Sequence, residues 1–172
     1  MSPTFTPPGA DEYAPFYAGY VAQVTGDPLA MLRDDAAAWH QLLSAMPESR
    51  GGYRYAEGKW SVREVLGHVI DTERIMSYRL LRLARQDPAP MASFDENSYV
   101  AHAGSDHRTV ADLARELQAV RAGTVALIES LDPATLTFVG TASSKPVSGR
   151  AMLYIVAGHS LHHRRIVEER YQ

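Results

Sequence analysis

A long amphipathic segment, residues 61–88, reads SVREVLGHVIDTERIMSYRLLRLARQDP. Ser61 and Glu64 have capping-box spacing, in which each side chain accepts a hydrogen bond from a free backbone N–H at a helix start. Pro88 marks the end, because proline disfavours helical conformation in the residue before it. Apolar residues recur at the helical period of three or four positions: Val62, Val65, Leu66, Val69, Met76, Leu80 and Leu83. We predict a helix from residue 61 to about residue 86.

Three other segments share this periodicity. Asp27-Pro28, an N-cap acid before a proline at the first helical position, predicts a helix that ends at Pro47. Thr109 opens another, which breaks at Asp132-Pro133, and Ser148 opens a last one that runs nearly to the C-terminus. Four helices without a convincing strand pattern predict an all-α four-helix bundle.

The regions outside the helices complete the predicted organisation. Residues 1–26 are rich in proline and predict an irregular N-terminal arm, so the bundle domain should span residues 27–172. The connection 87–108 is too long for a tight turn and indicates either a crossover or a lid over a site. Residues 133–147 form a second, polar connection.

Composition excludes several function classes. The net charge is −3 and basic residues are scattered, so a nucleic-acid partner is not expected. The chain has no cysteine, and no apolar run approaches the roughly 20 residues that span a bilayer. The N-terminus lacks the basic and apolar regions of a signal peptide. We expect a cytoplasmic protein that does not interact with membranes.

Histidines on two predicted helices suggest a metal site. His159 and His163 are four residues apart, so both imidazoles emerge on the apolar face of the last helix. His68 lies in an apolar turn of the 61–86 helix and is the best candidate for a third ligand. Gly67 and Gly158 each precede a histidine. Glycine is costly inside a helix, so its presence suggests that a neighbouring helix or bound group approaches closely at these positions. Hydrogen-bonded core histidines are the alternative interpretation.

Three neutral imidazoles would leave a coordination position open, as catalytic metal sites do. Asp71 and Thr72, one turn beyond His68, are within reach of the edge of such a site, and Asp71 is a candidate supporting group. Glu73 points away from His68 and is expected to pair with a basic residue at the surface. Arg164 and Arg165 are candidates either for binding an anionic substrate or for favourable interaction with the helix dipole.

Two stretches resemble the DinB-like superfamily, which includes YfiT-like proteins. They are GKWSVREVLGHVIDTER, residues 58–74, and GHSLHHRRI, residues 158–166. The resemblance covers about residues 27–170 and rests on the three histidines in these two contexts. It implies a bundle with up-down-down-up connectivity, which would explain the long 87–108 connection. It also implies a divalent metal, most often nickel or zinc, on His68, His159 and His163, and commonly a homodimer.

The expected function is metal-dependent chemistry on a small molecule. Relatives in this family carry out hydrolysis, or transfer and isomerisation with low-molecular-weight thiols. Since the chain has no cysteine, any thiol must come from a cosubstrate. We expect a hydrolase or a thiol-dependent S-transferase in which the metal activates water or the thiol. The rival hypothesis is a non-catalytic, stress-responsive bundle that binds metal for structure or sensing.

Overall fold

A computed structural model describes residues 4–171 of the chain. The helices are α1 (Ala18–Val21), α2 (Pro28–Ala45), α3 (Val62–Ala84), α4 (Glu96–His102), α5 (Val110–Glu129) and α6 (Gly149–Arg170). A short hairpin joins β1 (Val139–Ala142) to β2 (Lys145–Ser148). Within residues 4–171, every helix is too short or too polar to serve as a membrane span.

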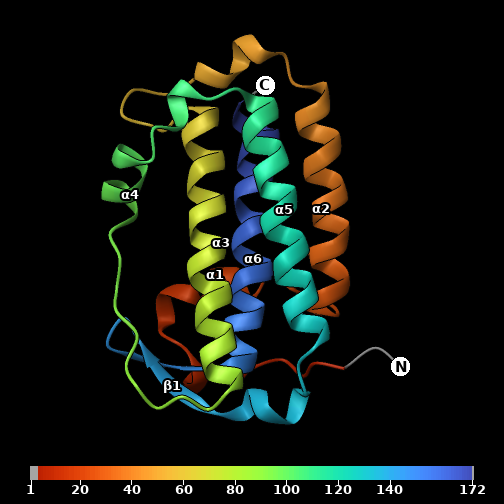
Figure 1. Ribbon diagram of the computed structural model, residues 1–172, viewed down its shortest axis with the longest axis vertical. Helices are drawn as coiled ribbons and strands as arrows, with labels where there is room; N and C mark the ends of the chain where they lie inside the picture. The colour runs from red at the N-terminus through yellow and green to blue at the C-terminus, as the bar shows by residue number, and fades with distance from the viewer. Residues whose placement is uncertain (1–3, 172) are drawn as a thin grey trace.

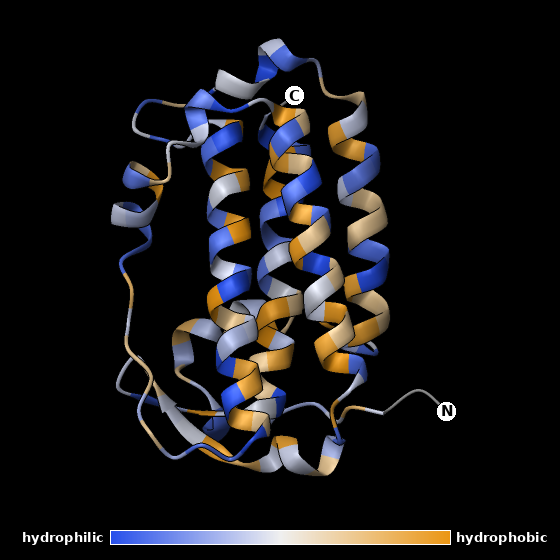
Figure 2. Cartoon of the chain, in the orientation of Figure 1, coloured by the Kyte–Doolittle hydropathy of each residue, from blue (hydrophilic) through white to orange (hydrophobic). Residues whose placement is uncertain are grey.

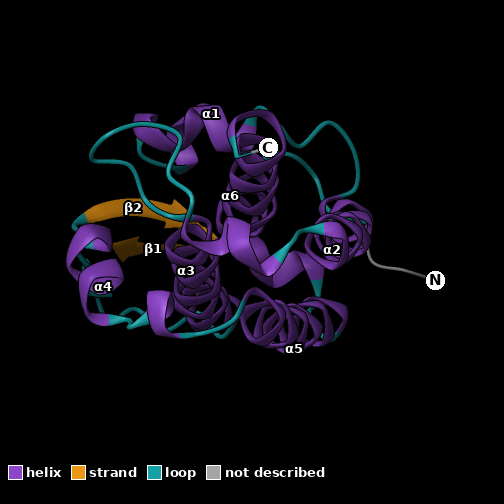
Figure 3. Cartoon of the chain, turned by 90° about the horizontal axis from the view of Figure 1, so that it is seen from above, coloured by secondary structure: helices purple, strands orange, loops and turns teal. Residues whose placement is uncertain are grey.

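The four long helices, α2, α3, α5 and α6, form the bundle (Figure 1). In Figure 1, α2 and α6 run upwards along the chain, whereas α3 and α5 run downwards. Seen from above, α2 lies diagonally across from α3, and α5 lies diagonally across from α6 (Figure 3). Because α3 and α5 are parallel, the chain must return to the top between them, and the 87–108 connection does so along the outside of α3. The predicted up-down-down-up connectivity is confirmed.

The predicted N-cap residues of the four bundle helices are confirmed. The side chains of Asp27, Ser61, Thr109 and Ser148 each accept a hydrogen bond from the backbone N–H three residues later. Glu64 completes the capping box of α3 by accepting the backbone N–H of Ser61 at 2.8 Å. Each cap contributes about 1 kcal/mol and defines where its helix begins.

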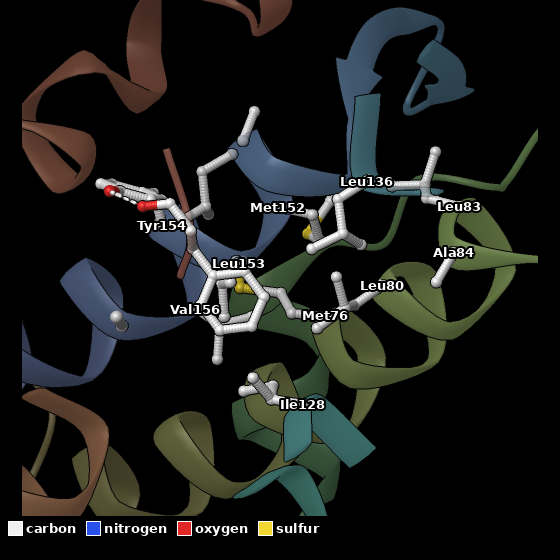
Figure 4. Packing of buried hydrophobic residues seen from close by; sticks show 14 of the residues in the cluster. Met76, Leu80, Leu83, Ala84, Ile128, Leu136, Met152, Leu153, Tyr154 and Val156 are labelled. Carbon is white, nitrogen blue, oxygen red and sulfur yellow. Dashed lines mark hydrogen bonds between the residues drawn. The ribbon is translucent and has the colours of Figure 1, made fainter. Parts of the chain in front are cut away.

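The hydrophobic core has a lower and an upper half. In the lower half, Met76 and Leu80 of α3 pack with Met152 and Val156 of α6 (Figure 4). The upper half is built around Trp39 and other apolar residues of the bundle helices. Hydrophilic and hydrophobic residues alternate around these helices, as the 3.6-residue period requires (Figure 2). Between the two halves each helix contributes buried polar residues, and the site lies at this level.

The sequence analysis found no strand in the 133–147 connection, and there it missed the β1–β2 hairpin. The two strands pair antiparallel, with Val139 opposite Ser148 and Ala142 opposite Lys145. The two turn residues, Ser143 and Ser144, both have positive φ (52° and 61°). Two-residue hairpin turns of this kind usually contain Asn-Gly or Asp-Gly, and this one lacks that signature.

The N-terminal segment is partly helical and covers α6. Residues 4–26 contain two 3₁₀ turns, Ala10–Glu12 and Pro15–Tyr17, followed by α1. Helix α1 packs on α6 on the side away from the bundle axis (Figure 3). As a result, residues 151–161 of α6 are buried all round. The centre of α6 is therefore shielded both by the bundle and by the N-terminal segment.

Candidate metal centre

The structure brings together the three histidines that the sequence singled out. The Nε2 atom of His68, on α3, lies 3.0 Å from Nε2 of His159 and 3.2 Å from Nε2 of His163, both on α6. One ligand atom from each residue lies within 4.8 Å of the others. His68 and His159 are buried, and His163 is half-buried. All three side chains therefore point their Nε2 atoms at one shared volume.

Burial keeps these imidazoles neutral. It lowers the pKa of His68 to about 4. It also lowers the pKa of His159 and of His163 well below 6.5, and the neighbouring imidazoles lower both further. A neutral imidazole has a free lone pair, which is the form that binds a metal ion. The three residues therefore present ligand atoms near neutral pH without first losing a proton.

The cluster fits a divalent cation better than it fits hydrogen bonding alone. A neutral imidazole has one N–H, so Nε2 of His68 can donate to only one of its two Nε2 neighbours. A cation would satisfy all three lone pairs. Ligands about 2.0–2.1 Å from a tetrahedral zinc ion lie about 3.3 Å apart, close to the 3.0 and 3.2 Å observed.

Neighbouring side chains hold the imidazoles in place. The Trp60 ring lies 4.8 Å from the ring of His68, and the Tyr20 ring lies 5.4 Å from that of His159. The Thr72 hydroxyl is 3.5 Å from Nδ1 of His68, a long contact on the side away from the cluster. Tyr20 comes from α1, so the N-terminal segment takes part in the site. Sequence reasoning did not identify this role, because the contact is formed only when α1 packs on α6.

Asp71 lies one turn from His68 but faces Arg74. Its carboxylate oxygen is 3.7 Å from an Arg74 nitrogen, and burial raises its pKa although Arg74 opposes the shift. Among residues 4–171, Thr72 is the α3 side chain beyond His68 that contacts an imidazole of the cluster. A role for Asp71 stays a prediction.

The expectation that Glu73 forms a surface pair was wrong. Glu73 is 3% exposed, and its two carboxylate oxygens accept hydrogen bonds at 2.8 Å from Nε and Nη2 of Arg121 on α5. Arg121 also lies 3.3 Å from Asp35 of α2. Ser160 of α6 donates to Asp35 at 2.6 Å and accepts from Arg121 at 2.6 Å. The ion pair is buried because these residues face inward between the two halves of the core.

This buried network joins all four bundle helices next to the metal cluster. Burial alone would lower the pKa of Arg121, but Glu73 and then Asp35 more than offset it and raise the pKa. Arg164, a candidate for anion binding, donates from Nε to Asp35 at 2.6 Å and also pairs with Glu168. Arg165 is exposed and donates to Gln23. Arg164 thus has protein carboxylates as partners.

Two cavities reach the cluster. One, of about 260 Å³, ends at His159 and is lined by Thr72, Arg79 and the aromatic residues of the N-terminal segment. The other, of about 280 Å³, ends at His163 and is lined by Trp60 and Tyr171 among others. Of the two expected alternatives for the 87–108 connection, the structure shows the crossover, and residues of this connection also line both cavities.

Sequence reasoning overlooked Arg79, although a signal for it was present. Residues 68, 72, 76 and 79 follow one another at steps of four, four and three along α3, so they lie on one face. A charged residue in such a stripe, next to the apolar Leu80 and Leu83, indicates a buried cation, although the sequence does not identify its partners.

At both Gly-His pairs another segment approaches closely, as expected: the backbone of α1 at Gly158, and a side chain of the 87–108 connection at Gly67. A Cβ at Gly158 would lie 2.0 Å from the backbone oxygen of Tyr20, and a Cβ at Gly67 would lie 2.1 Å from the hydroxyl of Ser105. The Ser105 hydroxyl can rotate away, whereas the Tyr20 backbone can move only with α1.

We therefore expect unequal effects of alanine at these two glycines. Gly158→Ala should lower the free energy of unfolding by about 1–3 kcal/mol, because overpacking forces α1 away from α6. Gly67→Ala should cost less, since the gain of about 1 kcal/mol in helix propensity offsets a smaller clash. Denaturant unfolding of both variants measures this difference, and equal losses would contradict it.

Comparison with known proteins places these features in a family. The model of the DinB superfamily matches residues 31–167. The structure of YfiT from Bacillus subtilis, described as a probable metal-dependent hydrolase with an unusual four-helix bundle topology, matches with a TM-score of 0.75 and 17% identity. The match covers 96% of this chain and 91% of that one. A search of curated proteins by sequence gave no match.

Two structures of a mycothiol-dependent maleylpyruvate isomerase, one of them a mutant, are also similar. The TM-scores are 0.65 and 0.59, each at 15% identity. The matches cover 79% and 80% of this chain, but only 57% and 58% of the isomerase chains. At these identities, the likeness to the solved structures shows a shared fold.

Proposed function

Because the chain belongs to the DinB superfamily, we propose that it is a metal-dependent enzyme acting on a small molecule, with His68, His159 and His163 holding one divalent ion. The convergence of three ring nitrogens within 4.8 Å of one another carries the proposal. Three protein ligands leave a position open for water or substrate, which is the arrangement of catalytic sites. Both cavities end at a histidine of the cluster, so small molecules have a route to that position.

The chain's own residues prepare the site. An ion bound there would act as a Lewis acid that makes a thiol or water nucleophilic near neutral pH. Thr72 is placed to accept the Nδ1–H of His68, which leaves the Nε2 lone pair directed at the cluster. Trp60 and Tyr20 pack against the rings and restrict both their rotation and the access of water.

Two cavities favour a reaction with two substrates, such as S-transfer from a thiol cosubstrate. In that reaction the thiol loses its proton to solvent, and its sulfur bonds to an electrophilic carbon. The leaving group departs with the electron pair of the bond that breaks. In the hydrolytic alternative, the oxygen of water takes the place of sulfur. Cavities of about 260 and 280 Å³ suit small molecules.

Further properties belong to the same proposal. Nickel or zinc is the expected ion, since imidazole nitrogen suits both. We propose a cytoplasmic homodimer in which residues 27–172 form the bundle domain. A net charge of −3 is consistent with a small-molecule substrate and gives no basis for nucleic-acid binding.

A turnover assay with defined metal content tests this function. The full chain is purified without a histidine tag, depleted of metal, and reloaded with zinc or nickel. It is then assayed with thiol–electrophile pairs and with a panel of esters and amides. We expect turnover that metal restores and that His163→Ala abolishes, while His162→Ala retains it.

The same experiment discriminates the non-catalytic rival. If metal raises the melting temperature but no thiol, ester or amide is converted, the ion is structural or sensory and the enzymatic proposal fails. Circular dichroism of each variant verifies that loss of turnover does not reflect loss of the fold.

A further inference from the structure

Arg79 is a buried cation that has no carboxylate partner among the described residues. It is 2% exposed. Its Nη2 donates to the backbone oxygen of Ala92 at 2.6 Å and to the hydroxyl of Ser143 at 3.1 Å. Its guanidinium lies 5.7 Å from the centre of the Phe94 ring. The Tyr17 hydroxyl is a further neighbour: burial raises its pKa, and Arg79 opposes the shift through charge and a hydrogen bond.

The contrast with Arg121 shows what Arg79 lacks. Both guanidinium groups are buried, and Arg121 is neutralised by Glu73 and Asp35. In residues 4–171, all partners of Arg79 are uncharged. A buried charge without a counter-ion is costly, so proteins rarely keep one unless it has a partner. A guanidinium has five N–H groups, and Ala92, Ser143 and Tyr17 use three of them.

Arg79 faces the same cavity as the metal cluster. The cavity of about 260 Å³ is lined by Arg79, Thr72 and His159, with walls of aromatic side chains. Thr72 and Arg79 are seven residues apart on α3, which corresponds to about 10 Å along the helix axis. A small molecule in this cavity would contact the cation at one end and the cluster at the other.

The charges around the cavity favour a single negative charge on the ligand. Glu96 also lines it, and its carboxylate raises the pKa of Tyr17 and of Tyr20 beyond the effect of burial. Arg79 and Glu96 both line the cavity without pairing, so each further negative charge on a ligand adds repulsion from Glu96, and a monoanion is favoured over a phosphate dianion. Both N–H groups of Nη2 are used by Ala92 and Ser143, so the N–H groups of Nε and Nη1 remain to donate charge-assisted hydrogen bonds to a carboxylate oxygen.

We infer that this cavity binds the carboxylate of an aromatic or apolar acid through Arg79, so that the reactive part of that substrate faces His68, His159 and His163. The orientation of the reactive part toward the three histidines rests on the proposed function. The binding of the carboxylate does not require the metal ion.

Binding of matched small acids and amides tests the inference. Benzoate and benzamide have nearly the same shape but differ in charge. They are titrated by calorimetry into the full chain, both metal-free and zinc-loaded. In the metal-free protein we expect benzoate to bind at least about tenfold more tightly than benzamide. This preference should weaken as salt is added.

Variants on α3 and α4 assign the preference to one residue. Arg79→Met should remove the preference for benzoate, whereas Arg85→Met, which removes an exposed charge at the end of α3, should leave it intact. Glu96→Gln should tighten benzoate binding several-fold by removing a like charge. If Arg79→Met does not fold, the wild-type comparison of benzoate with benzamide decides the question.

Each result supports or overturns the inference. Equal binding of benzoate and benzamide, or a preference that persists in folded Arg79→Met, would overturn it. Tighter binding of phenylphosphonate than of benzoate would assign the cavity to phosphate-type ligands instead. A benzoate preference without metal-dependent turnover would support the carboxylate subsite and reject the proposed enzyme. Metal-dependent turnover without the benzoate preference would support the proposed enzyme and reject the carboxylate subsite.

Discussion

His163→Ala is expected to reduce the affinity of the protein for zinc or nickel by more than about 100-fold. Loss of a supporting group around a metal typically costs 10–100-fold, and loss of a direct ligand should cost more. His163 is the best of the three histidines for this test. It is half-buried, so truncating it should disturb the core less than truncating the buried His159. Competition with a chromophoric chelator measures the change.

The neighbouring His162 provides the matched control. Its ring is 5.1 Å from that of His163, but it contributes no atom to the three-nitrogen cluster. His162→Ala should bind metal as the wild type does. Equal losses in both variants, or an unchanged affinity in His163→Ala, would refute the triad.

The same titration has an expected pH dependence. The pKa of His68 is about 4, and burial holds those of His159 and His163 well below 6.5. Protons therefore compete with the ion only at pH values well below the ordinary imidazole pKa of about 6.5. The affinity at pH 6 should stay close to that at pH 7.5, whereas a site of ordinary imidazoles would weaken over this range.

Arg121→Met is expected to lower the free energy of unfolding by about 3–5 kcal/mol. The substitution keeps most of the side-chain volume but leaves the carboxylates of Glu73 and Asp35 buried without a cation, which is the costly way to break a buried pair. Such a loss is a large part of the 5–15 kcal/mol typical of a whole domain. Denaturant unfolding with metal-free protein measures it directly.

An exposed ion pair gives the comparison for Arg121. Arg33 pairs with Glu129, and both side chains are about half exposed. Arg33→Met should cost less than about 1 kcal/mol, because exposed pairs contribute little. A similarly small loss in Arg121→Met would mean that water reaches Glu73 or Asp35 in the variant.

The network also explains how stability and site geometry are connected. Ser160, which directly follows His159, bonds to Asp35 of α2 and Arg121 of α5, and it accepts the Trp39 ring N–H at 3.2 Å. These bonds restrict rotation of α6 about its own axis. The direction in which His159 and His163 point therefore depends on residues of two other helices.

Local signals were sufficient to predict the helices and the three histidines. A cap such as Ser61 or Asp27 acts within one turn, and apolar periodicity reports which face of a helix is buried. The same periodicity placed His159 and His163 on one inner face. The bundle could therefore be inferred from local signals, whereas the meeting of these two histidines with His68 was a hypothesis that the resemblance to the DinB-like superfamily strengthened.

Contacts between distant segments were decided only by the tertiary structure. The partner of Glu73 is 48 residues away on α5, and the aromatic cover of His159 comes from the N-terminal segment. Ser143 and Ser144 in the hairpin turn both have positive φ, which their residue type does not predict. The helical stripe indicated that Arg79 is buried, but only the structure showed its cavity and the lack of a counter-ion among residues 4–171. Periodicity records that a residue faces inward, but it does not record which residue it meets, and the free energy of a buried charge depends on that partner.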